Sequence, residues 1–220
     1  MKNILFSLFL MGLAYSKSSI YFDVMMTNSL DLDLSWSDPA SSLSLSGEDE
    51  LDGSCLSFGY EYDFFNKEKY NFILSLGLSY TIIPIEKNNI PYFAGSNLIS
   101  PLDNKFPIIS SYFKVTLPVD ENLDVWTSLG ISKIDSKEDY YVYVTSSANY
   151  IPIKEILFDT GFTYGVGIDY KMKNGFFAGF NFIYDVYDYN SKVEPSLNTF
   201  YSASGSIDLL RRSIRIGYAF

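Results

Sequence analysis

The stretch that decides the fold is Tyr70–Ile82, YNFILSLGLSYTI. Every second residue from Tyr70 to Ile82 is large and apolar or aromatic, whereas most positions between them are small or polar, such as Ser75 and Gly77. A period of two residues belongs to a β-strand, because successive side chains of a strand point to opposite faces. The stretch therefore predicts a strand with one apolar face and one mostly polar face.

The same alternation recurs along the whole chain and predicts an all-β protein with eight strands. The predicted strands cover residues 20–26, 56–64, 70–82, 109–117, 124–131, 158–170, 176–186 and 213–220. No Asp, Glu, Lys or Arg stands on their apolar faces. The alternation of the first strand continues through Trp36. Between Phe200 and Arg212 the phase differs from that of the final strand, and we expect a bulge near 210–212 to shift it.

The connections between these strands alternate in length. The short ones are 65–69, 118–123 and 171–175, and the long ones are 37–54, 83–108, 132–157 and 187–200. We expect all eight prolines to lie in connections, because proline removes a hydrogen bond from a sheet. Short turns at one end and long loops at the other are typical of an antiparallel up-and-down barrel that spans an outer membrane.

Three features favour a barrel whose apolar face points outward into lipid. Glycines stand only on the other face, where a narrow barrel has little room: they are Gly59, Gly77, Gly130, Gly161, Gly165, Gly167, Gly179 and Gly217. Aromatic residues near the strand ends suit the membrane–water interface: they are Tyr62, Phe64, Tyr70, Tyr80, Tyr170, Phe176 and Tyr184. Strands of about ten residues also match the required apolar band. The alternative is a soluble, lipocalin-like barrel that keeps its apolar face inside and binds an apolar ligand.

The chain ends RSIRIGYAF, with Phe220 last. In this final strand the sequence resembles the small outer-membrane β-barrel superfamily, the OmpA/OmpX-type barrels, which commonly finish on an alternating strand with a terminal aromatic residue. The resemblance implies that Tyr218 and Phe220 form the signal read by the outer-membrane assembly machinery. It also implies a location in the outer membrane of a Gram-negative cell, in contact with membrane lipid and lipopolysaccharide. We expect no peptidoglycan-binding domain and hence no tether to the cell wall.

The first residues have the pattern of a secretory signal peptide. Lys2 precedes a short apolar run, 4–13, and Ala14 and Ser16 are small residues at the positions that a signal peptidase reads. We therefore expect residues 1–16 to be removed and residues 17–220 to form the barrel domain.

Composition argues against several functions. A formal net charge of −10 disfavours nucleic acid as a partner. The chain has no histidine, the residue on which several outer-membrane enzymes rely for a base near neutral pH. We therefore expect no enzymatic activity, and no motif predicts a cofactor or a metal site.

The polar face carries the charged residues that the sequence predicts for the barrel interior. They are Asp23, Glu61, Asp63, Asp124, Asp159, Asp169 and Asp185 against Lys114, Arg211 and Arg215. Buried charges must be paired, so one interpretation is a plugged interior whose ion pairs fix the register. The other is a charge gate or a narrow cation-preferring pore. Because the last strand must pair with the first, we expect Asp23 to contact Arg215.

Two functions follow from this pattern. The favoured one is a structural, envelope-integrity or surface-interaction role that the protein exerts through its long extracellular loops. No motif in the sequence indicates which ligand these loops bind. Those loops carry an acidic stretch at 48–52 and several tyrosines at 140–150. The alternative is a narrow, porin-like channel for small solutes or ions.

Overall fold

The computed structural model describes residues 17–37, 42–51, 56–67, 71–84, 91–93, 96–99, 105–134, 141–144, 149–158, 160–196 and 199–220. The predicted signal peptide, residues 1–16, lies outside this range, as does Asp159. No helix among the described residues is long and apolar enough to cross a membrane.

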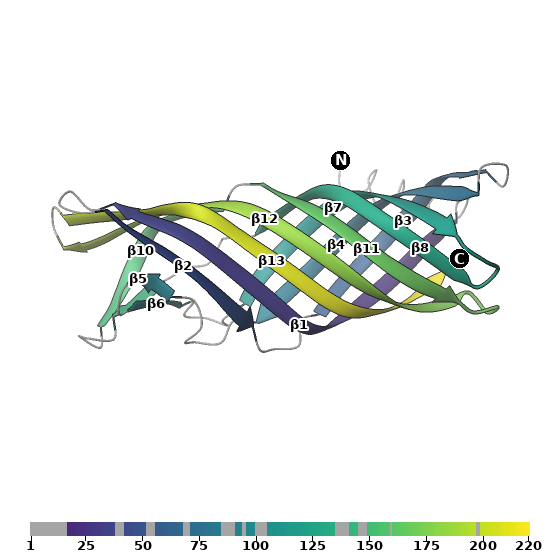
Figure 1. Ribbon diagram of the computed structural model, residues 1–220, viewed down its shortest axis with the longest axis horizontal. Coiled ribbons are helices and arrows are strands. Elements are labelled where there is room, and N and C mark those ends of the chain that lie inside the picture. Colours follow the sequence, from purple (N-terminus) through teal and green to yellow (C-terminus); the bar gives the residue numbers. More distant parts are fainter. Residues whose placement is uncertain are drawn as a thin grey trace, which may run out of the picture.

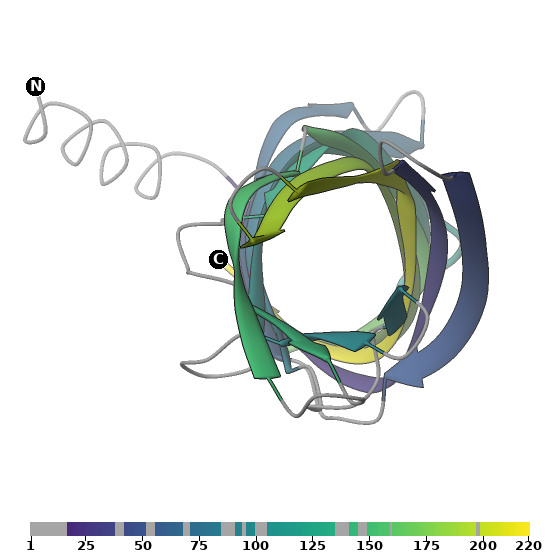
Figure 2. The same cartoon turned by 90° about the vertical axis from the view of Figure 1, so that its left-hand side faces the viewer.

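Eight strands form a closed antiparallel barrel, as the sequence predicts (Figures 1 and 2). They are β1 (Ser18–Ser37), β3 (Leu56–Lys67), β4 (Phe72–Pro84), β7 (Lys105–Pro118), β8 (Leu123–Ile134), β11 (Gly161–Lys171), β12 (Phe176–Ser196) and β13 (Thr199–Ala219). Each pairs with the next around the ring, and β13 pairs with β1 to close it. At the junction, the Phe220 backbone N–H donates to the Ser18 carbonyl at 2.9 Å.

The apolar faces point outward and the polar faces point inward. Many large apolar side chains on the outer wall are exposed, including Leu78 at 57%, Leu129 at 64% and Phe162 at 66%. Charged residues on the alternating positions are buried inside, among them Asp23 and Arg215 at 1% each. Such an outer wall is stable only where lipid covers it, because monomeric soluble proteins rarely expose large contiguous apolar patches.

Glycines on the inner face make room for aromatic rings that also point inward. Gly59 lies opposite Tyr21, and Gly77 lies opposite Tyr112. A Cβ atom at Gly59 would lie 2.0 Å from the Tyr21 ring, and one at Gly77 would lie 2.1 Å from the Tyr112 ring. Trp126 has the same relation to Gly167. The interior is therefore filled by rings lying over cross-strand glycines, and the glycines do not line an empty lumen.

Several strands are longer than predicted, and the long connections contain strands of their own. The segment 187–200, predicted as a loop, continues β12 and β13 to within two residues of each other. The other three connections hold β2 (Ser42–Leu51), β5 (Pro91–Phe93), β6 (Ser96–Ile99), β9 (Tyr141–Val144) and β10 (Asn149–Phe158). β2 pairs with the outer half of β1, and β10 pairs with the outer half of β12. Their acidic, serine-rich or proline-containing sequences resemble those of loops, and their pairing depends on contacts distant in the sequence. β2 and β10 pair with long barrel strands, whereas β5 pairs with β6, β6 with β9, and β9 with β10.

The bulge expected near 210–212 is not in β13. Residues 207, 209, 211, 213, 215 and 217 are all buried, so the phase of β13 stays constant. The register instead shifts in the paired strand β1, between Met25 and Thr27, opposite Ser213 and Arg212. The apolar residues Ile207 and Leu209, whose phase differs from that of the final lipid-facing residues, are both buried inside the barrel, so no shift within β13 is needed.

The proline prediction is also wrong, because all six prolines that the structure describes lie in strands. Pro84 and Pro118 are the last residues of β4 and β7, Pro107 pairs with Ile82, and Pro91 begins β5. Pro152 and Pro195 lie in β10 and β12. Strand ends and edges tolerate proline because no ladder N–H is needed there. Pro39 and Pro101 lie outside the described residues.

The short connections between β7 and β8 and between β11 and β12 are tight turns held by side-chain hydrogen bonds. Between β7 and β8, the Asp120 carboxylate accepts the backbone N–H groups of Asn122 at 2.7 Å and of Leu123 at 2.8 Å. Between β11 and β12, Gly175 has a φ of +87°, a conformation that suits glycine. The C-terminus lies at this short-turn end of the barrel, opposite the end from which β2 and β10 extend (Figure 1).

We predict that Gly167→Ala destabilises the barrel by about 1–3 kcal/mol, because the added methyl group collides with the Trp126 ring. The measurement is urea unfolding of the protein reconstituted in lipid vesicles. The control is Val166→Leu, which changes the neighbouring, lipid-facing position and should leave stability nearly unchanged. Equal stability of Gly167→Ala and the wild-type protein would contradict the glycine–ring packing.

Candidate functional site

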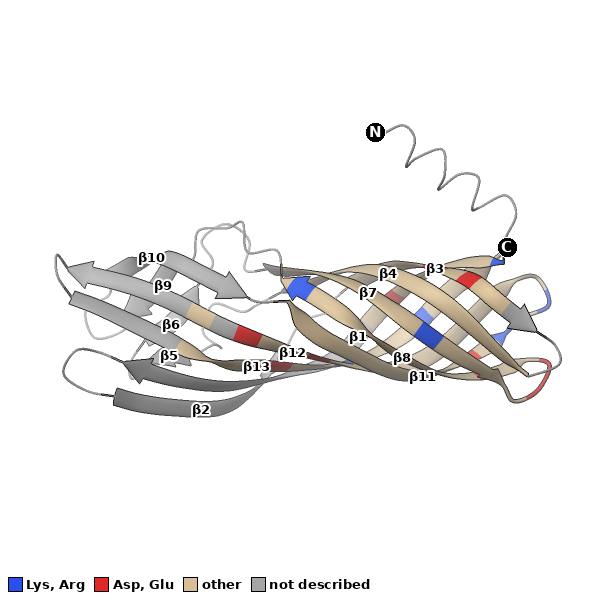
Figure 3. Ribbon diagram, turned by 90° about the horizontal axis from the view of Figure 1, so that it is seen from above, with Lys and Arg blue, Asp and Glu red and all other residues tan. Residues whose placement is uncertain are grey.

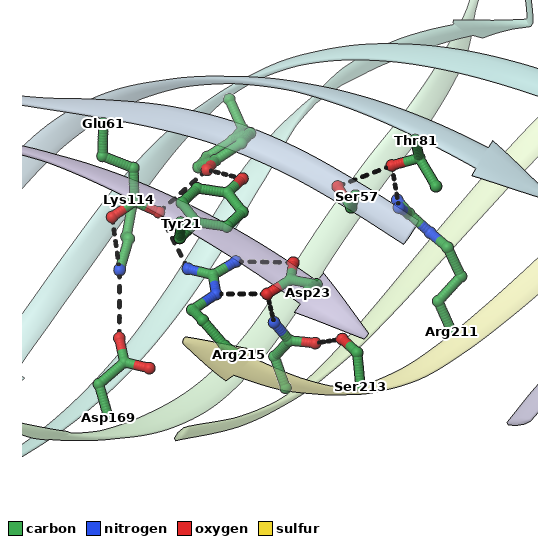
Figure 4. Close-up of polar contacts among 12 residues, drawn as sticks. Tyr21, Asp23, Ser57, Glu61, Thr81, Lys114, Asp169, Arg211, Ser213 and Arg215 are labelled. Atoms are coloured by element: carbon green, nitrogen blue, oxygen red, sulfur yellow. Dashed lines mark hydrogen bonds and ion pairs between the residues drawn. The ribbon is translucent and has the colours of Figure 1, made fainter. Parts of the chain in front are cut away.

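Arg215 of β13 is the centre of a buried ion cluster inside the barrel (Figure 4). Its Nε donates to Asp23 Oδ1 at 3.0 Å, and one terminal nitrogen donates to Glu61 Oε1 at 3.0 Å. The contact with Asp23 that the sequence analysis expected is therefore present. It follows from the β1–β13 register, in which Asp23 is the direct partner of Arg215.

The cluster continues across the barrel through a second cation. Lys114 of β7 donates to Glu61 Oε2 at 2.8 Å and lies 3.5 Å from Asp169 Oδ2 on β11. Glu61 thus bridges the two cations. The five charged groups of the cluster are each at most 5% exposed: they are Asp23, Glu61, Lys114, Asp169 and Arg215.

Aromatic side chains complete the cluster. The guanidinium carbon of Arg215 lies 3.9 Å from the centroid of the Tyr21 ring and 4.6 Å from that of Trp126. Lys114 Nζ lies 4.6 Å from the Trp126 ring, so both cations gain cation–π contacts. Tyr112 donates its hydroxyl hydrogen to Glu61 at 2.9 Å. Because that hydrogen is used, Tyr21 must be the donor in the 2.6 Å contact between the two tyrosine hydroxyls.

A second ion pair lies farther along β13, away from the C-terminus. Arg211 contacts Asp185 of β12 at 2.7 Å and donates to Thr81 Oγ1 of β4 at 2.9 Å. Thr81 in turn donates to Ser57 of β3 at 3.0 Å. Arg211 and Arg215 thus each contact strands that are not neighbours of β13 in the barrel. Figure 3 shows charged positions on the strands of the barrel.

A vestibule lies on the short-turn side of the cluster. This cavity of about 380 Å³ is lined by Lys17 and Phe220 at its outer end and by Glu61, Lys114 and Asp169 at its inner end. On the other side, the next described cavity holds only about 10 Å³ and is lined in part by Tyr112, Trp126 and Arg215. The ion cluster and its rings therefore separate the two spaces.

The structure brings five of the ten sequence-predicted interior charges together around Arg215, and two more form the separate pair of Arg211 and Asp185. Asp124 is buried near the short-turn end and pairs with the half-exposed Lys171 at 2.8 Å. Asp63 is only half-buried, because β3 has a register shift between Asp63 and Phe65, and it accepts a hydrogen bond from Ser75 at 2.7 Å. Asp159 cannot be placed, since it lies outside the described residues.

Sequence reasoning missed the uncharged members of the site. Asn181 of β12 donates to Asp23 at 3.1 Å and accepts from Ser213. The inward rings of Tyr21, Tyr112 and Trp126 were also not recognised. The sequence does indicate these inward rings, because each is an aromatic residue on the polar face of its strand.

Tyr218 and Phe220, which the resemblance assigns to assembly, lie on the outer wall. Their rings are 5.8 Å apart, and Tyr218 also contacts Phe176 at 5.0 Å between centroids. Both are partly exposed at the short-turn end. We propose that they serve as the assembly signal.

A closed ring of eight strands with lipid-facing apolar residues and buried, paired charges defines a small transmembrane β-barrel of the outer-membrane type. Among solved structures, the chain is similar to the outer membrane protein OprG from Pseudomonas aeruginosa, with 9% identity, a TM-score of 0.53, and coverage of 93% of this chain and 97% of that chain. It is also similar to the outer membrane protein AlkL in lipid bilayers, with 11% identity, a TM-score of 0.52, and coverage of 93% and 90%. At these identities the likeness establishes the fold. No family model matches the chain, and no curated protein matches its sequence.

We predict that Arg215→Met, which keeps much of the side-chain volume, costs about 3–5 kcal/mol, because it leaves the buried Asp23 without a cation and removes one of the two cations that contact Glu61. Urea unfolding in lipid vesicles measures the loss. Lys173→Met, in the exposed turn between β11 and β12, is the matched control. It removes a cation from an exposed position and should cost less than about 1 kcal/mol. Similar losses in both variants would refute the central role of Arg215.

Proposed function

We propose that this protein is a non-conducting, non-enzymatic barrel of the outer membrane that acts through the part of the molecule projecting beyond the barrel. The observation that carries the proposal is the closed interior. Charges and rings from β1, β3, β7, β8, β11 and β13 meet across the barrel around Arg215. Eight-stranded barrels generally have interiors just wide enough for side chains to fill.

The length of three neighbouring strands supports a role on the extracellular side. β1, β12 and β13 have 20, 21 and 21 residues, whereas β8 and β11 have 12 and 11. The excess of about ten residues lies at the end opposite the C-terminus, where β2 and β10 add to the same sheet. A tall, paired wall of this kind presents a surface for contact with other molecules, and functional variation commonly resides in such projecting segments.

Membrane lipid and lipopolysaccharide are the partners proposed for the barrel wall, because the wall is apolar and carries aromatic side chains near both ends. The assembly machinery is the partner proposed for the terminal strand.

A narrow channel is the competing function, since the vestibule reaches as far as Glu61 and Lys114.

We predict that the wild-type protein, refolded in detergent and checked for heat-modifiable gel mobility, shows no steady conductance in a planar bilayer. The double variant Tyr112→Ala/Trp126→Ala is the positive control, because it removes two rings that separate the cavities. It should conduct. A steady, cation-preferring wild-type conductance that falls in Asp23→Asn or Asp169→Asn would establish the channel instead.

We also predict that shortening the β12–β13 hairpin abolishes surface contact without unfolding the barrel. The variant joins Asp188 to Ser206, which are direct partners in the sheet, through an Asn-Gly turn. Adherence of bacteria carrying the full-length or the shortened protein to cultured epithelial cells is the measurement. Heat-modifiable mobility verifies folding, and unchanged adherence of the shortened, folded protein would count against the surface role.

A further inference from the structure

The vestibule at the short-turn end has the chemistry of a binding site that the surface role does not use. Four carboxylates line it, those of Glu61, Asp63, Asp124 and Asp169. Three lysines, Lys17, Lys114 and Lys171, line it as well. Some of these lysines and carboxylates already form ion pairs with one another.

The two inner lysines are committed to carboxylates. Lys114 contacts both Glu61 and Asp169, and Lys171 contacts Asp124. Lys17 is exposed at the outer end of the vestibule. Carboxylates outnumber the cations in the cavity wall, and they offer only hydrogen-bond acceptors. The wall therefore favours a ligand that donates hydrogen bonds and carries positive charge.

Asp169 supplies the most specific evidence. Its side chain is more than nine-tenths buried, and Oδ2 faces Lys114 at 3.5 Å, whereas Oδ1 has no hydrogen-bond partner among the residues that the structure describes. Figure 4 shows this carboxylate with only one of its two oxygens in contact with Lys114. A buried, unpaired carboxylate oxygen is costly unless something donates to it. The Asp63 carboxylate is the second candidate acceptor. Within the described part of the chain, its side chain accepts one hydrogen bond, from Ser75, and forms no ion pair.

The rest of the vestibule wall is apolar. Ile73, Met172, Phe176 and Phe177 line it beside the carboxylates. An apolar wall with a few convergent polar groups is the usual composition of a small-molecule site, and about 380 Å³ lies within the size range of such sites. No group of three or more acidic or cysteine side chains among the described residues is arranged to hold a metal ion. An organic cation therefore suits the cavity better than a metal.

We propose that the vestibule binds a small organic ammonium ion with an apolar body, whose N–H groups donate to Asp169 and Asp63 and whose body packs against Phe177 and Ile73. The site opens at the end of the barrel that carries the short turns and the C-terminus, and it is separate from the projecting strands of the proposed surface role.

The test is an NMR titration of the full-length protein in detergent micelles with benzylammonium, following backbone amide shifts. Benzylammonium should shift the amides of residues around the vestibule, such as Lys171 and Gly175, in a saturable manner. Benzyl alcohol and benzoate have nearly the same shape without the positive charge and should bind at least about tenfold more weakly.

Three variants locate the site. Asp169→Asn and Asp63→Asn should each weaken benzylammonium binding by about tenfold, because each removes a charged acceptor. Asp188→Asn, on the exposed surface of β12 at the other end of the molecule, should leave it unchanged. Heat-modifiable mobility shows whether each variant is folded, and Asp63→Asn provides the test if Asp169→Asn does not fold. Absence of saturable shifts, equal binding of benzoate, or unchanged affinity in a folded Asp63→Asn variant would overturn the proposal.

Discussion

The guanidinium group of Arg215, held between Asp23 and Glu61, is the interaction on which the interior depends. A buried cation in an apolar shell is stable only when carboxylates satisfy it, and here those carboxylates come from β1 and β3. Lys114 and Asp169 extend the same network to β7 and β11. A one-residue slip between β13 and β1 would turn Asp23 toward lipid and leave Arg215 without its partner. The cluster thus favours one register over its alternatives and closes the barrel at the same time.

Packing around the cluster depends on pairs of glycine and aromatic residues on neighbouring strands. Tyr21, Tyr112 and Trp126 are bulky for the interior of an eight-stranded barrel, and each lies over a glycine that leaves space for its ring. The rings then exclude water from the charged groups, which strengthens their electrostatic interactions. The lipid-facing side chains have no comparable constraint, because they need only be apolar and interfacial.

Alternation made the barrel predictable because one face of every strand meets lipid and the other meets charges. The same reasoning placed Asp23 opposite Arg215, since barrel closure fixes which strands meet. It failed where apolar residues point inward, as with Ile207 and Leu209, because alternation does not tell an inward apolar side chain from an outward one. It also missed the outer halves of β12 and β13, whose polar residues pair as strands beyond the lipid-facing part of the barrel. The vestibule was not predictable, because it depends on the register shift near Asp63 and on which lysines are already paired.

The most direct test of this account is a solid-state NMR measurement, in lipid bilayers, of the distances from the guanidinium nitrogens of Arg215 to the carboxyl carbons of Asp23 and Glu61. Direct hydrogen-bonded ion pairs require nitrogen–carbon separations of about 4 Å or less to both residues. The account predicts both contacts. Separations beyond about 6 Å to either carboxyl group, where no direct hydrogen bond is formed, would contradict the central cluster and with it the closed interior.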